Sequence, residues 1–161
     1  MGWLHSGDYG CRVGRRDDVR VGIMGPMSVK RGRRDETFVD MVGEAFAWLV
    51  SDAGLVGPEL TDLVIPCATY HGPVVEYRIC FDTGDACVET SIRLGNGAPT
   101  GWVRLEHVIR SAGYPYRERM RVSAQTRHAL RQSLASQSEW ARRLHERLAG
   151  PDGERLLRPS L

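Results

Sequence analysis

The sequence predicts a single α+β domain, residues 35–161, in which a three-stranded antiparallel meander is covered on one face by helices in the order α-β-β-β-α-α. Three observations predict this fold. They are an apolar stripe of helical period after residue 35, two alternating runs within residues 74–94, and two further helical stripes after residue 100. A three-stranded sheet with one apolar face is not stable alone, so we expect the helices to pack on that face. Residues 1–34, rich in Gly and Arg, predict a basic flexible N-terminal tail.

The segment DETFVDMVGEAFAWLVSDAG, residues 35–54, predicts the first helix. Acidic residues near its start complement the positive end of the helix dipole, and Gly54 is suited to end it. Its apolar residues recur at steps of three and four, which places them on one broad buried face: Phe38, Met41, Val42, Ala45 and Leu49, widened by Val39, Phe46 and Val50.

The run LVIPCATY, residues 63–70, predicts the first strand. Pro66 cannot donate a hydrogen bond to a neighbouring strand, so this strand is expected at a sheet edge or with a bulge. A three-residue loop over residues 71–73 would place Cys67 beside Tyr77 and turn it toward the core.

The runs VVEYRICF (residues 74–81) and CVETSIRL (residues 87–94) predict a hairpin, because each alternates side chains between two faces. The residues between them suit a type II′ turn at Gly84-Asp85, with the glycine at positive φ. This turn pairs the apolar residues on one face: Phe81 with Val88, Ile79 with Thr90, Tyr77 with Ile92, and Val75 with Leu94.

On the other face the same register places Glu76 opposite Arg93, a pair of opposite charges. A three-residue turn would instead put Ile79 beside Glu89. The apolar pattern rejects that alternative.

Two helices follow the strands. WVRLEHVIRSAG, residues 102–113, carries an apolar stripe, with Thr100 as its predicted N-cap and Gly113 as its end. The last helix is expected from about Ser123 to Ala149, before Gly150-Pro151. In the tail beyond it, Leu156 and Leu157 are expected to fold back. The apolar residues of the last helix recur at helical spacing: Leu130, Leu134, Ala141, Leu144 and Leu148.

The net charge of +2 conceals strong segregation of charge along the chain. Residues 1–34 hold eight basic and three acidic side chains, a net charge of +5. Residues 35–95 hold two and eleven, a net charge of −9, and residues 96–161 hold twelve and six, a net charge of +6. Lys30 is the one lysine among 22 basic residues, and this arginine bias indicates a GC-rich source, a bacterium or its phage. The arginines are therefore weak evidence for DNA binding.

No run approaches the about 18 apolar residues that a membrane span needs, and the N-terminus lacks the apolar core of a secretory signal. We therefore expect a cytoplasmic protein whose four cysteines are reduced: Cys11, Cys67, Cys80 and Cys87. Their spacing to each other and to His71 does not match paired zinc ligands, and nearby carboxylates would raise the pKa of a thiol. The sequence thus predicts no metal, no cofactor and no catalytic residue.

Three candidate surfaces remain. Acidic residues of the sheet could bind a partner protein: Glu76, Asp82, Asp85 and Glu89. The GNGAPTG loop, leading from a strand to a predicted helix N-terminus, could bind an anion or nucleotide through Gly95, Gly97, Thr100 and Gly101. The last helix and the basic tail could bind nucleic acid through arginines of that helix: Arg127, Arg131, Arg142 and Arg143.

The layout from Phe38 to Leu157, about three quarters of the chain, resembles small bacterial immunity or accessory proteins. In these, a helix leads into three antiparallel strands, then a short helix ending in Gly (here LEHVIRSAG) and a long helix before a Gly-Asp-type break (here LAGPDGERLL). The resemblance implies a non-enzymatic protein that acts by binding another protein. Two alternative functions remain open, a nucleic-acid-binding regulator and an anion or nucleotide binder.

Overall fold

The structure is a computed structural model that describes residues 38–61, 64–95, 101–115 and 120–158. The predicted N-terminal tail, Gly97 and Thr100 lie outside the described residues. A helix over residues 38–45 comes first, and the remaining elements follow in chain order: α2 (Ala47–Ser51), β1 (Val56–Thr61), β2 (Cys67–His71), β3 (Val75–Asp82), β4 (Cys87–Leu94), β5 (Val103–Arg104), α3 (Leu105–Ser111), α4 (Arg127–Ala149) and α5 (Gly153–Leu156).

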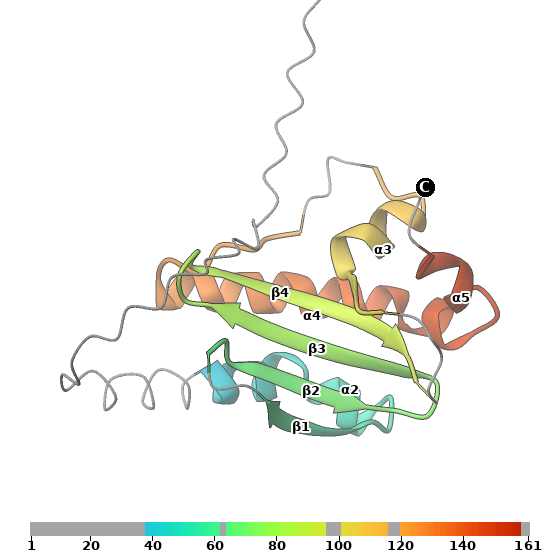
Figure 1. Cartoon of the computed structure of the whole chain (residues 1–161), viewed down its shortest axis with the longest axis horizontal. Coiled ribbons are helices and arrows are strands. Elements are labelled where there is room, and N and C mark those ends of the chain that lie inside the picture. The colour runs from blue at the N-terminus through green and yellow to red at the C-terminus, as the bar shows by residue number, and fades with distance from the viewer. Residues whose placement is uncertain (1–37, 62–63, 96–100, 116–119, 159–161) are drawn as a thin grey trace, which may run out of the picture.

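Within the described residues the sheet has five antiparallel strands in the order β1-β2-β3-β4-β5, and Figure 1 labels the first four of them. The α+β class is confirmed, and the three predicted strands correspond to β2, β3 and β4. The predicted strand number and the helix order are wrong. The added strands lie at the two edges, where β1 forms over residues for which no strand is predicted and β5 comes from the start of a predicted helix.

Edge strand β1 was hidden in the sequence by Gly57-Pro58, which is typical of a loop. The peptide bond between them is cis, and the pairing of β1 with β2 is irregular between Val56 and Glu59. Since β1 pairs with β2 alone in the part of the chain that the structure describes, a proline on it interrupts no second ladder there.

The central hairpin confirms the predicted register at every pair from Val75 and Leu94 to Asp82 and Cys87. Its turn differs from the prediction, because the positive φ falls at Ala86 and not at Gly84. The carboxylate of Asp82 accepts hydrogen bonds from the backbone N–H groups of Gly84 (2.8 Å) and Asp85 (3.1 Å), which organises a longer turn without changing the register.

The predicted register of the first hairpin is wrong by three residues. Cys67 lies opposite Cys80, and Tyr70 lies opposite Tyr77. Strand β2 begins after Pro66, whose carbonyl oxygen accepts a hydrogen bond from the N–H of Phe81 (2.9 Å), so β2 can lie inside the sheet. A slip by an odd number of residues exchanges the two faces of a strand, and Cys67 therefore faces away from the core.

The helices cover one face of the sheet, which we call the inner face (Figure 1). Alternate residues of β3 and β4 are buried there, as predicted: Val75, Tyr77, Ile79, Val88 and Ile92. They pack in one core with the predicted apolar stripes of the helices, including Phe38, Leu49, Val108, Leu134 and Leu144. Burial of apolar surface between the two layers is the main stabilising term of such a fold.

The first helix is interrupted where the sequence predicts a continuous one. Phe46 is in a turn between residues 38–45 and α2, although its N–H still donates to the carbonyl of Val42 (2.8 Å). Gly54 ends this region at φ +71°, as predicted. Trp48 of α2 donates a hydrogen bond to the Ser138 hydroxyl on α4 (2.9 Å), which links the two helices.

The long helix α4 begins at Arg127, four residues later than predicted, and ends at Ala149 as predicted. The Thr126 hydroxyl caps its start by accepting from the Ala129 N–H (3.0 Å). The residues before it are extended along the end of β4, with the N–H of Ala124 donating to the carbonyl of Ala86 (2.7 Å). Local propensity alone does not reveal this contact between distant segments.

Buried Gln137 of α4 holds the helix, the sheet and that extended segment together. Its amide nitrogen donates to the carbonyls of Val88 (2.8 Å) and Arg121 (2.9 Å), and its amide oxygen accepts from the Thr90 hydroxyl (2.7 Å). Polar groups at zero exposure are costly unless they are paired, so this set of bonds selects one position of α4 on the sheet.

The predicted end of α3 at Gly113 is confirmed, with φ +85°, but the helix starts only at Leu105. Leu156 and Leu157 fold back as predicted, and both are buried beside α4 through the short helix α5. No helix among the described parts of the chain is both long enough and apolar enough to cross a membrane.

Cys67 and Cys80 form a disulfide bond between the facing strands β2 and β3, so the prediction of reduced cysteines is wrong for this pair. The bond follows from the corrected register, which brings the two Cα atoms to 4.1 Å. Cys87 lies buried outside this bond, and Cys11 is outside the described residues.

We expect that replacing both Cys67 and Cys80 by alanine lowers the free energy of unfolding by about 3 kcal/mol, since the bond closes a short loop of the unfolded chain. Urea unfolding with and without dithiothreitol measures this. The reductant should lower the wild-type midpoint to that of the double variant and leave the variant unchanged. If the urea midpoint of the wild type stays the same when dithiothreitol is present at a concentration that reduces disulfides fully, the assigned bond is contradicted.

Candidate functional site

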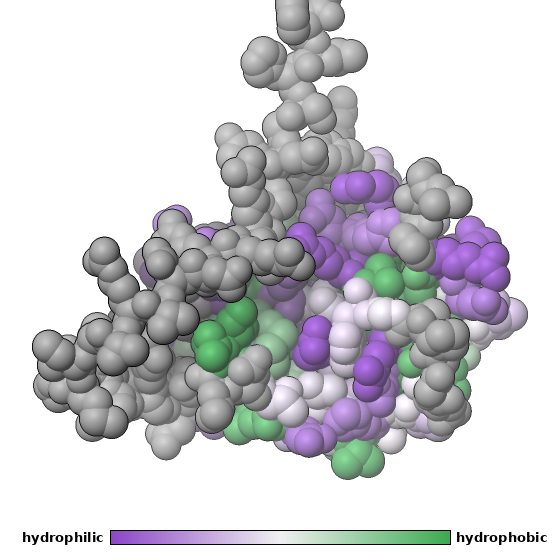
Figure 2. All heavy atoms as spheres, in the orientation of Figure 1, coloured by the Kyte–Doolittle hydropathy of each residue, from purple (hydrophilic) through white to green (hydrophobic). Residues whose placement is uncertain are grey.

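The outer face of the sheet is the side opposite the core, and none of the described helices covers it. In Figure 2, which keeps the orientation of Figure 1 with α4 behind the sheet, hydrophilic residues lie among intermediate and hydrophobic ones on the coloured part of the surface. The outer face is formed by the side chains that alternate with the core residues. Its charged and aromatic members, including one tryptophan before β5, are Glu59, His71, Glu76, Arg78, Asp82, Glu89, Arg93, Trp102 and Arg104.

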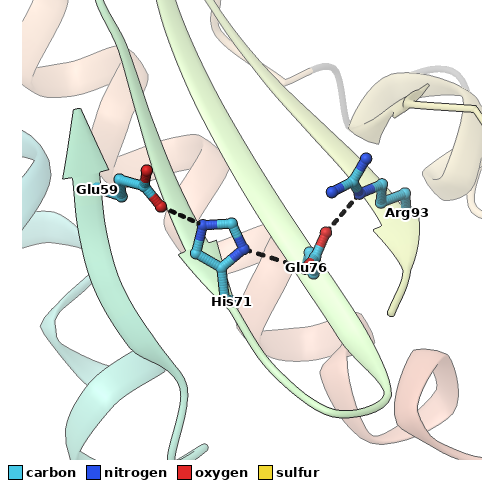
Figure 3. A network of polar contacts seen from close by, with 4 residues as sticks. All are labelled: Glu59, His71, Glu76 and Arg93. Atoms are coloured by element: carbon cyan, nitrogen blue, oxygen red, sulfur yellow. Dashed lines mark hydrogen bonds and ion pairs between the residues drawn. The ribbon is translucent and has the colours of Figure 1, made fainter. Parts of the chain in front are cut away.

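Four of these residues form a continuous polar chain across four strands (Figure 3). His71, at the end of β2, lies between two carboxylates. Its Nε2 is 2.9 Å from Glu59 Oε2 on β1, and its Nδ1 is 3.0 Å from Glu76 Oε1 on β3. The second oxygen of Glu76 accepts a hydrogen bond from Arg93 Nε on β4, which confirms the predicted contact of Glu76 with Arg93.

The polar chain shifts the pKa of both central groups. The hydrogen bond to Glu76 raises the pKa of His71 above its ordinary value, burial opposes this, and Glu59 adds to the rise. Burial acts to raise the pKa of Glu76, but the hydrogen bonds from His71 and Arg93 outweigh it and hold that pKa below its ordinary value. Relative to the free side chains, these shifts favour the protonated form of His71 and the ionised form of Glu76.

An aromatic residue contacts two arginines beside this polar chain. The guanidinium of Arg78 lies 4.4 Å from the ring centre of Trp102, and that of Arg93 lies 4.5 Å from it. Both contacts fall within the range of cation–π attraction. Arg93 thus joins the polar chain to the tryptophan.

The predicted acidic residues do not form one cluster. Glu76 lies at one end of β3 and Asp82 at the other, about 20 Å away along an extended strand. Glu89 lies nearer the turn and is paired with Arg104 of β5 (3.0 Å). Burial raises the pKa of Glu89, against the pull of Arg104 and with smaller additions from Glu106 and Asp82. Asp82, Asp85 and Glu89 are therefore the acidic end of the outer face, whereas Glu76 is an internal part of the polar chain.

The predicted anion site relied on a helix N-terminus directly after the GNGAPTG loop, and the structure places a strand there. The GNGAPTG loop leads into strand β5 and not into a helix N-terminus, since α3 starts at Leu105. The N–H of Gly95 donates to the carbonyl of Val74 (2.9 Å), and Gly101 is exposed. Gly97 and Thr100 cannot be placed beside them, because they lie outside the described residues.

Three of the four arginines predicted to contact nucleic acid face carboxylates of the same chain. Arg142 lies 2.7 Å from Asp52, Arg143 lies 3.2 Å from Glu139, and Arg131 lies 3.9 Å from Glu44. Arg127 is exposed at the start of α4. These pairs reduce the positive potential that would attract a phosphate backbone.

Sequence reasoning missed His71, Glu59 and Trp102 as parts of one surface. The predicted Glu76 and Arg93 pair was the one signal available, because Glu59 comes from an unpredicted strand and Trp102 was assigned to a helix. Among residues 38–61, 64–95, 101–115 and 120–158, no group of three or more His, Cys, Asp or Glu side chains is arranged to hold a metal ion.

Comparison with known proteins gives no relative for this chain: no family model, no curated protein and no solved structure matches it.

We expect Glu76→Gln to lower the pKa of His71, because it removes the strongest of the interactions that raise it. NMR titration of the imidazole proton resonances measures the change. Glu106→Gln, on α3, is the control and should leave the pKa of His71 unaltered. His145, whose pKa is lowered by burial, is an internal reference in the same titration. An unchanged His71 titration in Glu76→Gln would contradict the contact.

Proposed function

We propose that this protein is a non-enzymatic protein-binding module of immunity or regulatory type, and that its outer face is the partner-binding surface. The observation that carries the proposal is an antiparallel sheet whose outer face is left uncovered by the described helices and holds Trp102 in contact with two arginines. Tryptophan and arginine are the residue types most enriched where protein interfaces concentrate their binding energy.

The order of the polar chain supports binding more than chemistry. Both ring nitrogens of His71 contact carboxylates, and Glu76 contacts both His71 and Arg93. Side chains held in this way present a surface of defined shape, which reduces the entropy lost when a partner binds. In this proposal Glu76 positions its neighbours and the partner contacts the residues around it.

The acidic end of the outer face suits a partner with a basic surface. Asp85 is exposed at the turn, Asp82 is partly exposed beside it, and Glu89 lies on the adjoining strand. Charges at the rim of an interface mainly increase the association rate and select among partners. A basic nucleic-acid-binding site of another protein is one surface that such an end could cover.

The ion pairs on α4 favour this proposal over nucleic-acid binding. Asp52, Glu139 and Glu44 each lie against an arginine of that helix, so the positive charge is partly compensated within the fold.

Affinity capture from extracts of the source cells, followed by titration of the captured protein, tests the proposal. The test variant combines Asp82→Asn, Asp85→Arg and Glu89→Gln, and a second variant is Trp102→Ala. A matched control makes the same change in net charge away from the sheet: Asp40→Asn, Glu44→Arg and Glu154→Gln. Asparagine at position 82 retains an acceptor for the turn, and thermal unfolding verifies that each variant folds.

We expect the captured partner to bind the wild type and the control with the same affinity. It should bind the test variant at least about tenfold more weakly, which corresponds to about 1.4 kcal/mol of binding free energy. Trp102→Ala should weaken the same partner. If every specifically captured protein binds the test variant and Trp102→Ala as tightly as the wild type, the outer face is not the partner surface.

A further inference from the structure

Edge strand β1 has weak attachment to the rest of the sheet. Among the described strands it pairs with β2 alone, and its ladder is broken between Val56 and Glu59, where Pro58 supplies no N–H. Val56 and Leu60 are exposed on it. An edge strand with an interrupted ladder depends more than an inner strand on its side-chain contacts.

His71 supplies such a contact, and the contact needs a proton. The ring nitrogens lie 2.9 Å from Glu59 and 3.0 Å from Glu76, and ionised carboxylates can only accept hydrogen bonds. Neutral imidazole has one N–H, so it can satisfy one carboxylate and turns a lone pair toward the other. Only the imidazolium form donates to both.

We propose that His71 is a proton-operated clasp: its imidazolium fastens edge strand β1, through Glu59, to Glu76 in the interior of the sheet, and loss of the proton releases Glu59 and loosens β1. This inference rests on the geometry of the four residues in Figure 3 and does not depend on the proposed function.

The charged groups around His71 determine which contact is lost. Glu59 faces it from β1, Glu76 from β3, and Arg93 of β4 reaches it through Glu76. The side chain of Glu76 is 14% exposed and keeps Arg93 as a partner, whereas that of Glu59 is 63% exposed. Glu59 is better solvated and is therefore the carboxylate that neutral His71 releases.

The direction of the effect follows from the raised pKa of His71. A histidine whose folded pKa exceeds its unfolded value, about 6.5, contributes stability that is complete below the unfolded pKa and is lost as the pH rises through the folded pKa. The clasp is thus closed under mildly acidic conditions and opens toward alkaline pH.

Amide hydrogen exchange of the full chain tests the clasp strand by strand, from about pH 5.5 to about pH 9, with each rate corrected for its intrinsic pH dependence. We expect the protection factors of the β1 amides to fall by about two- to fivefold as the pH rises, the change that an exposed ion pair supports. The protection factors of the central-hairpin amides should not show the same dependence on pH.

Two variants separate His71 from other causes. His71→Gln should remove the pH-dependent fall in the protection factors of the β1 amides, which we call the step. Glu59→Gln should make this step smaller and should also lower the pKa of His71 in an NMR titration. Glu44→Gln, an exposed acid on the first helix, should leave the step intact. If His71→Gln does not fold, the Glu59→Gln comparison decides alone. Wild-type β1 protection that is independent of pH, or an unaltered step in either variant, would overturn the clasp.

Discussion

The antiparallel register between β3 and β4 decides which side chains reach the core and which reach the outer face. Pairing Tyr77 with Ile92 and Ile79 with Thr90 gathers the large apolar residues on one face, where the helices bury them. The same pairing places Glu76 opposite Arg93 on the other face. A shift by one residue would bring polar side chains into the core and apolar ones into water, so the apolar pattern and the charge pair select the same register. Gln137 then orients α4 on this hairpin by binding the backbone and a side chain of β4.

From this hairpin the two faces acquire different roles. The inner face is a packed core whose few polar groups mostly have partners: besides those of Gln137, Tyr77 Oη and His145 Nδ1 lie 2.9 Å apart and share a hydrogen bond. The outer face is a lateral series of charged and aromatic side chains, running from Glu59 at one edge to Arg104 at the other. Such a face can serve recognition without disturbing the core, because its side chains alternate with the core residues and do not contribute to its packing. The proposed partner surface and the proposed clasp both use this separation.

Much of the fold could be predicted from the sequence, because helical stripes and strict alternation report directly on burial. The register of the first hairpin could not be predicted. The segment LVIPCATY is apolar on both faces of the strand, so the apolar pattern permits several pairings. The error of three residues concealed the disulfide, as Cys67 meets Cys80 only in the true register. Strand β1 was missed because Gly57-Pro58 favours a loop, and with it Glu59 and the complete His71 contact were missed. Strand β5 is two residues long and depends on its pairing with β4, which local sequence does not encode.

The β3–β4 register separates a buried face from a polar outer face, and cross-strand nuclear Overhauser effects measure this register. In isotope-labelled protein, we expect backbone contacts that place Ile79 opposite Thr90 and Glu76 opposite Arg93. Contacts that place Ile79 opposite Glu89 would overturn this register, because the shifted pairing exchanges the faces of one strand and removes both the core and the polar chain.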